Sequence, residues 1–420
     1  CKEAISVSDI IVHKFGGSCL RDGNDIDRIG EIIENTKGKP VVVVSALWGM
    51  TDRLMRASNE PRYASRLVQD LIYQHLRFAP GLDKGDFCEL FNKVITGISN
   101  ELLKYSSGEK SLRSENLILA AGERLSALAV AHRLREKGIL DAHPVGAEDI
   151  GLKMKGIGRT KEIDIHASRL ELDVESLIGV PILTGWFGEG DDGEIALLTR
   201  GGSDHSAAAF ANLTNASKLV LWKDIDGIKR LNPRWGIETP SIPYLGYGQA
   251  AELSMHGTPI IHPATVLPLI NEGIPIEIKN FHNQNSTAAT VIGPDVDSDE
   301  VVAIGCQPGV AVITDNRPLD SILLSEMEIL GITPWLMNST PEKMKLVVPM
   351  HDFHLLEPTV TGKIEFKTAI ISIIGKAKIT IDHEVLSTNQ YGTRIIIDTD
   401  EIHETIRELY HSLFSRQDCK

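Results

Sequence analysis

A lysine and two glycines at the end of an apolar run are the first candidates for chemistry. The β-rich run at 10–15 (IIVHKF) contains Lys14 near its end and is directly followed by Gly16, Gly17 and Ser18. A glycine pair between a strand and a helix lets backbone amides approach an anion, and the helix N-terminus adds positive partial charge. Lys14 could neutralise a transferring phosphoryl group. The segment is predicted to cradle a phosphate, although an ordinary tight turn is the alternative and the sequence has neither a Walker A motif nor a protein-kinase glycine loop.

A second segment, at 199–204 (TRGGSD), combines a cation, two glycines and a carboxylate ahead of an alanine-rich helix. Arg200 could hold a substrate carboxylate through two parallel hydrogen bonds. The glycines would let amides face a phosphate, and Asp204 could orient Lys14 or the attacking group. The structural alternative is that Ser203 or Asp204 caps the helix and Arg200 is a surface charge.

A third candidate is Glu123, which lies in GERLS at 122–126 on a helix predicted to begin near Ser114. Its carboxylate could pair with a substrate ammonium. A single glutamate on a helix is also compatible with a solvated face.

The elements that must position these residues follow an α/β pattern. A strand at 10–15 is followed by a glycine turn and by a helix at 25–34 with isoleucines at helical spacing. The strand at 41–44 is continuously aliphatic, which is typical of a parallel sheet covered on both faces. The sequence therefore predicts a mostly parallel open sheet sandwiched by helices. Further predicted elements are a helical insertion at about 52–111, strands at 180–184, 218–222 and 274–279, and a helix at 203–213.

The pattern changes after Gly293 and Pro294, where an acidic, apolar-poor segment is a predicted linker. We therefore predict a first domain at 8–294 and a smaller α+β domain at 299–420. Asp398 with Glu401 suits a capping box at the start of the last helix. The elements predicted beyond the linker are strands near 301–304, 310–314, 344–348, 369–374 and 393–397, and helices near 320–329 and 400–414.

Charge and cysteine content narrow the class of protein. The formal net charge of -14 over 420 residues repels polyanions, so nucleic acid and acidic membranes are not expected partners. The 5 cysteines are odd in number and far apart, which indicates neither a disulfide framework nor a zinc site. No apolar run reaches the roughly 20 residues of a membrane span, and no secretory leader opens the chain. We expect a cytoplasmic protein.

Two further clusters receive structural interpretations. His256 and His262 lack a third ligand at useful spacing, so no metal site is expected. The acidic residues at 189–192 are predicted to form a solvated hairpin tip, with a flap over a substrate as the alternative.

The order of the motifs resembles that of the aspartate kinases, within the amino-acid kinase superfamily. The resemblance extends over about the first 290 residues, and the tail resembles a shortened, divergent ACT regulatory region through 324–333 (LSEMEILGIT) and 371–375 (ISIIG). The runs that carry it in the first part are KFGGSC at 14–19, VVVVSALWGMTD at 41–52, GERLSA at 122–127, TRGGSDHSAAA at 199–209, WKDIDGIKRLNPR at 222–234 and IIHPATV at 260–266.

The resemblance implies transfer of the γ-phosphate of ATP to the β-carboxylate of L-aspartate, giving 4-phospho-L-aspartate, a first step towards lysine, threonine and methionine. Lys14 would be the catalytic lysine that bridges the ATP phosphates, and Asp204 would organise the site. Magnesium would be held mainly by ATP oxygens, and a homodimer through the C-terminal domain is expected.

The resemblance also implies the binding residues. Arg200 would hold the α-carboxylate of aspartate, Glu123 its α-amino group, and Ser45 and Thr51 would help to position it. The residues implied on the nucleotide side, besides Lys14, are Gly16, Gly17, Ser18, Gly201, Gly202, Ser203, Asp224, Gly227 and Arg234.

The sequence departs from the family pattern at several positions. Family members usually carry Thr, Tyr and Asp at the positions of Lys223, Lys229 and Asn232, and a lysine is common at that of Pro259, so the nucleotide pocket is expected to differ in detail. Trp186 stands where family members usually carry Phe, and Cys19 where Ser is common. Both replacements are expected to be tolerated. The tail lacks the glycine-rich loop that receives lysine or threonine in the family, so inhibition by either is not implied.

Two alternatives remain open at this point. One is a relative that phosphorylates another amino-acid carboxylate, such as an acetylglutamate-type kinase. The other is a non-catalytic amino-acid sensor. Hydroxamate formation with ATP, magnesium and hydroxylamine would separate them.

Overall fold

The computed structural model of the chain describes residues 9–156, 161–198, 201–255, 261–283, 289–298, 300–330, 332, 334–376 and 383–414. The chain divides into two compact units. Unit 1 takes in the described residues of Cys1–Gly156, Lys161–Gly227 and Ala264–Val291, and unit 2 those of Ile157–Thr160, Ile228–Pro263 and Ile292–Lys420. The described residues of 228–263, which the predicted first domain includes, fall in unit 2, and the predicted domain bounds stay a prediction.

The centre of unit 1 is a parallel sheet with the order β11-β9-β1-β2-β6-β3. The predicted strand at 10–15 is β1, which pairs with β2 on one side and β9 on the other. This confirms the predicted mostly parallel open sheet. Its strands are β1 (Ile10–Phe15), β2 (Lys39–Val44), β3 (Ala142–Val145), β6 (Val180–Thr184), β9 (Lys218–Lys223) and β11 (Ile276–Asn280).

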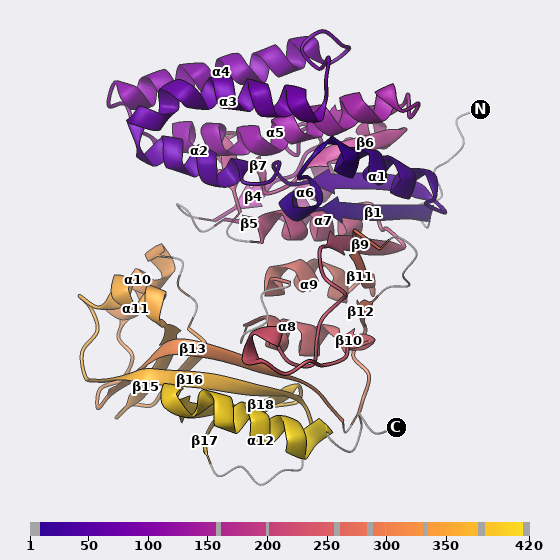
Figure 1. Cartoon of the computed structure of the whole chain (residues 1–420). Helices are drawn as coiled ribbons and strands as arrows, with labels where there is room; N and C mark the ends of the chain where they lie inside the picture. Colours follow the sequence, from indigo (N-terminus) through magenta and orange to yellow (C-terminus); the bar gives the residue numbers. More distant parts are fainter. Residues whose placement is uncertain are drawn as a thin grey trace. The chain divides into compact units, whose positions relative to one another are not determined.

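Helices cover both faces of this sheet (Figure 1). α1 (Gly23–Glu34) and α5 (Leu112–Glu136) bury their apolar side chains in one core cluster with β2 and β6. α7 (Gly202–Leu213) packs on β1, β2 and β9 from the other side. Val41 to Val44 are accordingly all buried, which explains why this strand is aliphatic throughout.

The predicted helical insertion consists of α2 (Met50–Asn59), α3 (Pro61–Phe78) and α4 (Cys88–Ser106). The remaining regular elements of unit 1 are short. They are β4 (Met154–Lys155), β5 (Glu162–Ile163), α6 (Ile165–Glu171), β7 (Phe187–Glu189), β8 (Ile195–Leu197) and α9 (Pro263–Ile270), with β12 (Thr290–Gly293) starting at the end of the unit.

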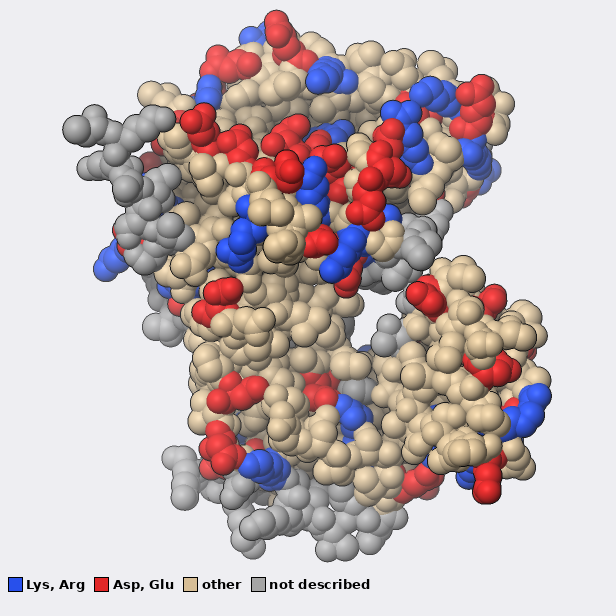
Figure 2. All heavy atoms as spheres, turned by 180° about the vertical axis from the view of Figure 1, so that it is seen from behind, with Lys and Arg blue, Asp and Glu red and all other residues tan. Residues whose placement is uncertain are grey.

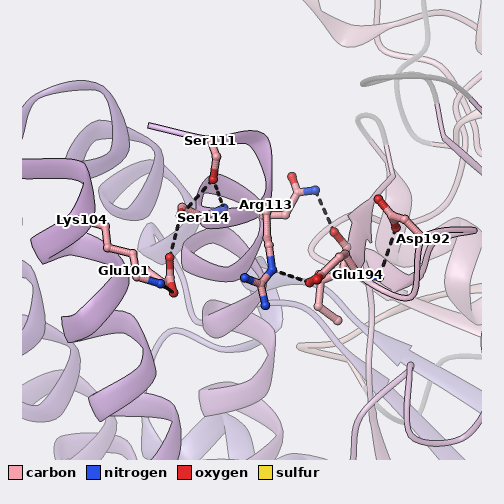
Figure 3. A network of polar contacts seen from close by, with 9 residues as sticks. Glu101, Lys104, Ser111, Arg113, Ser114, Asp192 and Glu194 are labelled. Carbon is pink, nitrogen blue, oxygen red and sulfur yellow. Dashed lines mark hydrogen bonds and ion pairs between the residues drawn. The ribbon is translucent and has the colours of Figure 1, made fainter. Parts of the chain in front are cut away.

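The acidic segment at 189–192 is confirmed as a hairpin tip, because β7 and β8 pair antiparallel on either side of it. Asp191 and Asp192 are exposed. Figure 3 shows how the hairpin is tied to the start of α5, where Arg113 Nε lies 2.6 Å from a Glu194 carboxylate oxygen. The alternative of a flap over a substrate stays a prediction.

Unit 2 contains an antiparallel sheet with the order β14-β15-β13-β16-β18-β17 and helices packed against it, which confirms a smaller α+β region. Its elements are β10 (Tyr244–Gly246), α8 (Tyr247–Met255), β13 (Val301–Asp315), α10 (Ser321–Leu330), β14 (Leu336–Ser339), β15 (Met344–Pro349), α11 (Met350–Leu356), β16 (Lys363–Gly375), β17 (Glu384–Asn389), β18 (Gly392–Asp398) and α12 (Ile402–Phe414).

Two local predictions for this unit were wrong in detail. The strands expected near 301–304 and 310–314 are one strand, β13, because bulges around Pro308 absorb the irregular stretch while pairing to β16 continues. The cap at Asp398 accepts a hydrogen bond from Asp400 N and begins a 3₁₀ turn at Thr399–Glu401 that leads into α12, rather than capping α12 itself.

On the face of the molecule seen in Figure 2, acidic and basic side chains are interspersed. Exposed ion pairs of the described residues, such as Arg62–Glu60, contribute little to stability individually. None of the described helices is both long and apolar enough to cross a bilayer.

Two helical glycines provide a matched test of packing. A Cβ on Gly122 in α5 would lie 2.9 Å from Ala46 Cβ and Leu54 Cδ1, whereas a Cβ on Gly97 in α4 would meet nothing within 4 Å. We expect Gly122→Ala to lower the free energy of unfolding by about 1–3 kcal/mol because the core is overpacked. Gly97→Ala should raise it by about 0.5–1 kcal/mol, since alanine is the better helix former. Denaturant unfolding of both variants would check this, and stabilisation by Gly122→Ala would contradict the close contact.

Candidate active site

Two lysines lie on the same face of the sheet, at the carboxyl ends of adjacent strands. Lys14 is in β1, and Lys223 is the last residue of β9. Lys14 is in register with Leu221, so alternation along β9 turns Lys223 to the face that Lys14 occupies. Phe15 and Trp222 point to the opposite face, where they join the core cluster of α1 and α5.

The carboxylate of Asp204 bridges these two lysines. Lys14 Nζ lies 2.6 Å from Asp204 Oδ1, and Lys223 Nζ lies 2.7 Å from Asp204 Oδ2. Asp204 sits in the first turn of α7, the helix that covers this face of the sheet. The structure therefore brings together the two predicted catalytic residues, 190 positions apart in the sequence, and adds a third charged group.

Burial shapes the charges of this cluster. Only 7% of each side chain of Lys14 and Asp204 is exposed. Burial by itself would raise the pKa of Asp204, but the two lysines together hold this pKa well below its ordinary value. Burial, aided by the charge of Lys223 and opposed by Asp204, lowers the pKa of Lys14. The carboxylate is therefore ionised, and it favours the protonated form of Lys14.

The predicted phosphate cradle follows Lys14 directly. A Cβ on Gly16 would lie 3.2 Å from Lys14 Nζ, so the backbone passes close to the ammonium group. Gly17 begins a 3₁₀ turn at Gly17–Cys19, and a Cβ there would lie 3.3 Å from the carbonyl oxygen of Ala46. The glycines thus keep the space around Lys14 free of side chains. Ser18 lies within this turn.

Glu123 is buried in α5 with one oxygen unused. Only 2% of the residue is exposed, and its Oε1 accepts a hydrogen bond from the Ala46 amide at 3.1 Å. Oε2 is buried without a hydrogen-bond partner among the residues that the structure describes. Burial raises the pKa of Glu123 to about 8, and the Ala46 amide and the charge of Lys14 only partly oppose this. The alternative of a solvated helix face is therefore wrong.

Ser45 and Thr51 lie on either side of the loop that carries Ala46. The Ser45 amide donates to the Phe15 carbonyl at 3.1 Å, which ties this loop to the end of β1. Thr51 is in the first turn of α2, whose N-cap Gly49 has a left-handed φ of 72°. Both side chains are partly exposed. Their predicted role in positioning a substrate stays a prediction.

Gly201 and Gly202, the second glycine pair, are each required for a different structural reason. Gly201 is the N-cap of α7 with φ of 78°, a conformation that favours glycine. A Cβ on Gly202 would lie 2.5 Å from Trp186 Cδ1, so Gly202 is required for close packing against the indole. Trp186 donates its Nε1–H to the Leu198 carbonyl at 2.7 Å. Ser203 follows, partly buried. Asp204 therefore stands on a closely packed helix start.

The residues predicted on the nucleotide side are divided between the two units, and their shared role stays a prediction. Asp224 follows β9 and lies 3.0 Å from Arg21 Nη2 in an exposed ion pair. Gly227 has φ of 77°, and a Cβ there would lie 2.6 Å from Thr290 Oγ1, so glycine is needed for the turn. Arg234 belongs to unit 2, where it donates to the Cys306 carbonyl at 2.6 Å. Arg200, the predicted carboxylate clamp, lies outside the described residues, as do His256 and Pro259.

Two other observations bear on chemistry. The thiol of Cys19 is buried and lies 3.4 Å from the Trp222 carbonyl oxygen, and burial raises its pKa to about 11, so it is not a nucleophile. Among the described residues, no group of three or more His, Cys, Asp and Glu side chains could hold a metal ion.

Lys223 was noted in the sequence only as a departure from the family pattern. The structure makes it a member of the charged cluster. The available signal was its position as the last residue of an aliphatic strand, at the edge where parallel strands place their functional residues.

Comparisons with known proteins bear on the family of the chain. The model of the amino acid kinase family matches residues 9–280. A bifunctional aspartokinase/homoserine dehydrogenase 2 of Arabidopsis thaliana is 28% identical over 74% of this chain and 35% of its own length. The lysine-sensitive aspartokinase 3 of Escherichia coli is 29% identical over 64% of the chain and 61% of its own length. The chain spans about a third of the length of the bifunctional plant relatives.

The fold as a whole is also found among solved structures. Escherichia coli aspartokinase III, solved in complex with aspartate and ADP, superposes with a TM-score of 0.81 at 20% identity, over 97% of this chain and 100% of that one. This likeness confirms the predicted fold class. The two relatives and the solved structure named here are called aspartokinases, in agreement with the predicted resemblance. Because the family model covers more than half of the sequence, the chain belongs to the amino acid kinase family.

Proposed function

We propose that the chain is an aspartate kinase, which transfers the γ-phosphate of ATP to the β-carboxylate of L-aspartate. The observation that carries this proposal is the buried Glu123 carboxylate, with one unpartnered oxygen, in a site that also holds the Lys14–Asp204 pair. An ammonium group is the partner that Glu123 lacks. A free amino acid supplies it, whereas an N-acetylated substrate offers a neutral amide, so the site favours aspartate over acetylglutamate.

The reaction needs little from the protein beyond alignment and charge. A β-carboxylate oxygen of aspartate attacks the γ-phosphorus of ATP, the bond from that phosphorus to the β,γ-bridging oxygen breaks, and ADP leaves with the electron pair. The carboxylate is already ionised, so no general base is required. Lys14 would neutralise charge that develops on the transferring group, and Asp204 would hold Lys14 in place.

The remaining site residues have supporting roles in this proposal. Glu123 would bind the α-ammonium of aspartate and Arg200 its α-carboxylate, with Ser45 and Thr51 beside them. Gly16 to Ser18 and Gly201 to Ser203 would line the phosphates, and Asp224, Gly227 and Arg234 would lie on the nucleotide side.

Magnesium would be held by the ATP phosphates rather than by a protein cage. The carboxylate nearest to Lys14, that of Asp204, is already paired with two ammonium groups, so it is a poor ligand for a cation. Mg²⁺ also keeps several waters when it binds, which suits a phosphate-held ion. Bound with ATP, it would supply further neutralisation of phosphate charge.

We also propose a regulatory and dimerising role for the second region. Residues 8–294 would form the catalytic domain and 299–420 an ACT-like domain, and the chain would be a cytoplasmic homodimer through the latter. The antiparallel sheet of unit 2, with the helices packed against it, supports the interpretation as an ACT-like domain. Analytical ultracentrifugation would show whether the chain is a dimer.

The assignment of Lys14 predicts a specific loss of turnover. Lys14→Ala should lower the rate of hydroxamate formation from aspartate, ATP, magnesium and hydroxylamine by about a hundredfold or more, because charge on the phosphoryl group is no longer neutralised. The fold should persist, since Lys223 still pairs with Asp204. A variant with an unchanged melting temperature and near-normal turnover would refute the role of Lys14.

The raised pKa of Glu123 predicts that the affinity for aspartate depends on pH. Only the ionised carboxylate can pair with an ammonium, and with a pKa of about 8 this form becomes more abundant as the pH rises. The KM for aspartate should therefore fall by about tenfold between pH 6.5 and 8. Glu123→Gln should raise this KM and remove its pH dependence.

Thermal unfolding provides the control for Glu123→Gln. The pKa of Glu123 is higher in the folded state than in the unfolded state. The free energy of unfolding therefore falls as the pH rises from the pKa of the unfolded state towards 8, because the folded protein disfavours the ionised carboxylate. The glutamine variant should match the wild type near pH 4 and melt a few degrees higher at pH 8.5. A variant that is less stable at pH 8.5, or a KM that does not change with pH, would count against an ammonium site at Glu123.

A further inference from the structure

The cluster around Asp204 carries more positive charge than its own balance requires. Lys14 and Lys223 contribute two positive charges and Asp204 one negative charge, so the three groups together carry a net charge of +1. Lys14 alone would neutralise the carboxylate. A second lysine leaves an excess cation in a mostly buried place, which is unfavourable unless an anion is bound there.

The carboxylates that follow Lys223 in the chain have other partners. Asp224 pairs with Arg21 at 3.0 Å, and Asp226 Oδ1 accepts a hydrogen bond from Asn280 Nδ2 at 2.7 Å. The ion pair of Lys223 is with Asp204. Within the cluster of Lys14, Lys223 and Asp204, one positive charge is left unbalanced.

Both ammonium groups keep the capacity to bind an anion. Each has three N–H donors, and the contact with Asp204 needs one of them. Lys14 lies beside the open backbone of Gly16. The side chain of Lys223 is 19% exposed, compared with 7% for that of Lys14, so Lys223 lies on the more accessible side of the cluster.

We propose that Lys223 is a second phosphate-binding residue, which contacts the polyphosphate of a nucleoside triphosphate together with Lys14 while Asp204 holds both ammonium groups apart and oriented. This inference rests on the proposed function for the existence of a nucleotide site, and it assigns to Lys223 a role in binding the polyphosphate part of the nucleotide. The binding of aspartate is not expected to depend on Lys223.

The test is to neutralise Lys223 and to measure nucleotide and amino-acid binding separately. Lys223→Met and Lys223→Thr should each weaken MgATP binding, measured by titration calorimetry, by about tenfold or more, the loss of one charge-assisted contact. The KM for ATP should rise in proportion, and the KM for aspartate should stay within twofold. Lys223→Arg, which keeps the charge, should bind MgATP within about threefold of the wild type.

A matched control lies on the same strand. Lys218, the first residue of β9, pairs with Glu277 at 2.8 Å and is outside the cluster. Lys218→Met also removes a lysine from a partly buried ion pair, but it should leave MgATP affinity and both KM values within twofold. Melting temperatures of all variants would verify folding, and Lys223→Arg decides the case if the neutral variants do not fold.

The outcomes separate this inference from the proposed function. Unchanged MgATP affinity in a folded Lys223→Met or Lys223→Thr variant would overturn it, as would equal losses for ATP and aspartate, which indicate a merely structural role. A tenfold loss in Lys223→Arg would also overturn it. If the wild type binds MgATP but forms no hydroxamate from aspartate, the aspartate assignment fails while the calorimetric comparison still decides the role of Lys223. A wild type that does not bind MgATP overturns both.

Discussion

The sharing of one buried carboxylate between two lysines is the constraint on which unit 1 depends. An isolated charge at such a position would cost several kcal/mol of desolvation, so the three groups are stable only together. Their meeting requires β1 and β9 to be adjacent and parallel, and α7 to begin directly above their carboxyl ends. The left-handed Gly201 and the close approach of Gly202 to Trp186 fix where α7 begins. The local need for glycine at these two positions thus helps to place Asp204 beside Lys14, which lies on a distant segment of the chain.

Much of unit 1 could be predicted because its signals are local. The strand at 10–15 coincides with β1, and the strand at 180–184 coincides with β6. Both end at glycine-containing turns after aliphatic runs. The same local signals place Lys14 and Asp204 at strand and helix ends. Lys223 was missed because its role depends on strand order. Its position at the end of an aliphatic strand was a signal, but no local residue indicates that this strand lies next to β1, more than 200 positions earlier.

Unit 2 was less predictable because its contacts are mostly non-local. Pairing to β16 before and after Gly309 keeps β13 continuous through a glycine that locally indicates a turn. The segment at 228–263 belongs to this unit through contacts of the same kind. Glu252 of α8 forms an ion pair with Arg394 of β18, and Arg234 donates to the Cys306 carbonyl. Such pairs join residues more than 70 positions apart and leave no periodic pattern in the sequence.

The two buried carboxylates of the site show how environment divides their roles. Asp204 has two cations and a pKa far below its ordinary value, whereas Glu123 has one amide donor and a pKa raised to about 8. A glutamine at position 123 would avoid the cost of an ionisable group in this place, so an acid there is disfavoured by stability alone. The lysine cluster carries an excess positive charge, and Glu123 lacks a cation. Anionic phosphate at one and an ammonium at the other would satisfy both, so the charges of these groups support the proposed pair of ligands, a polyphosphate and a free amino acid.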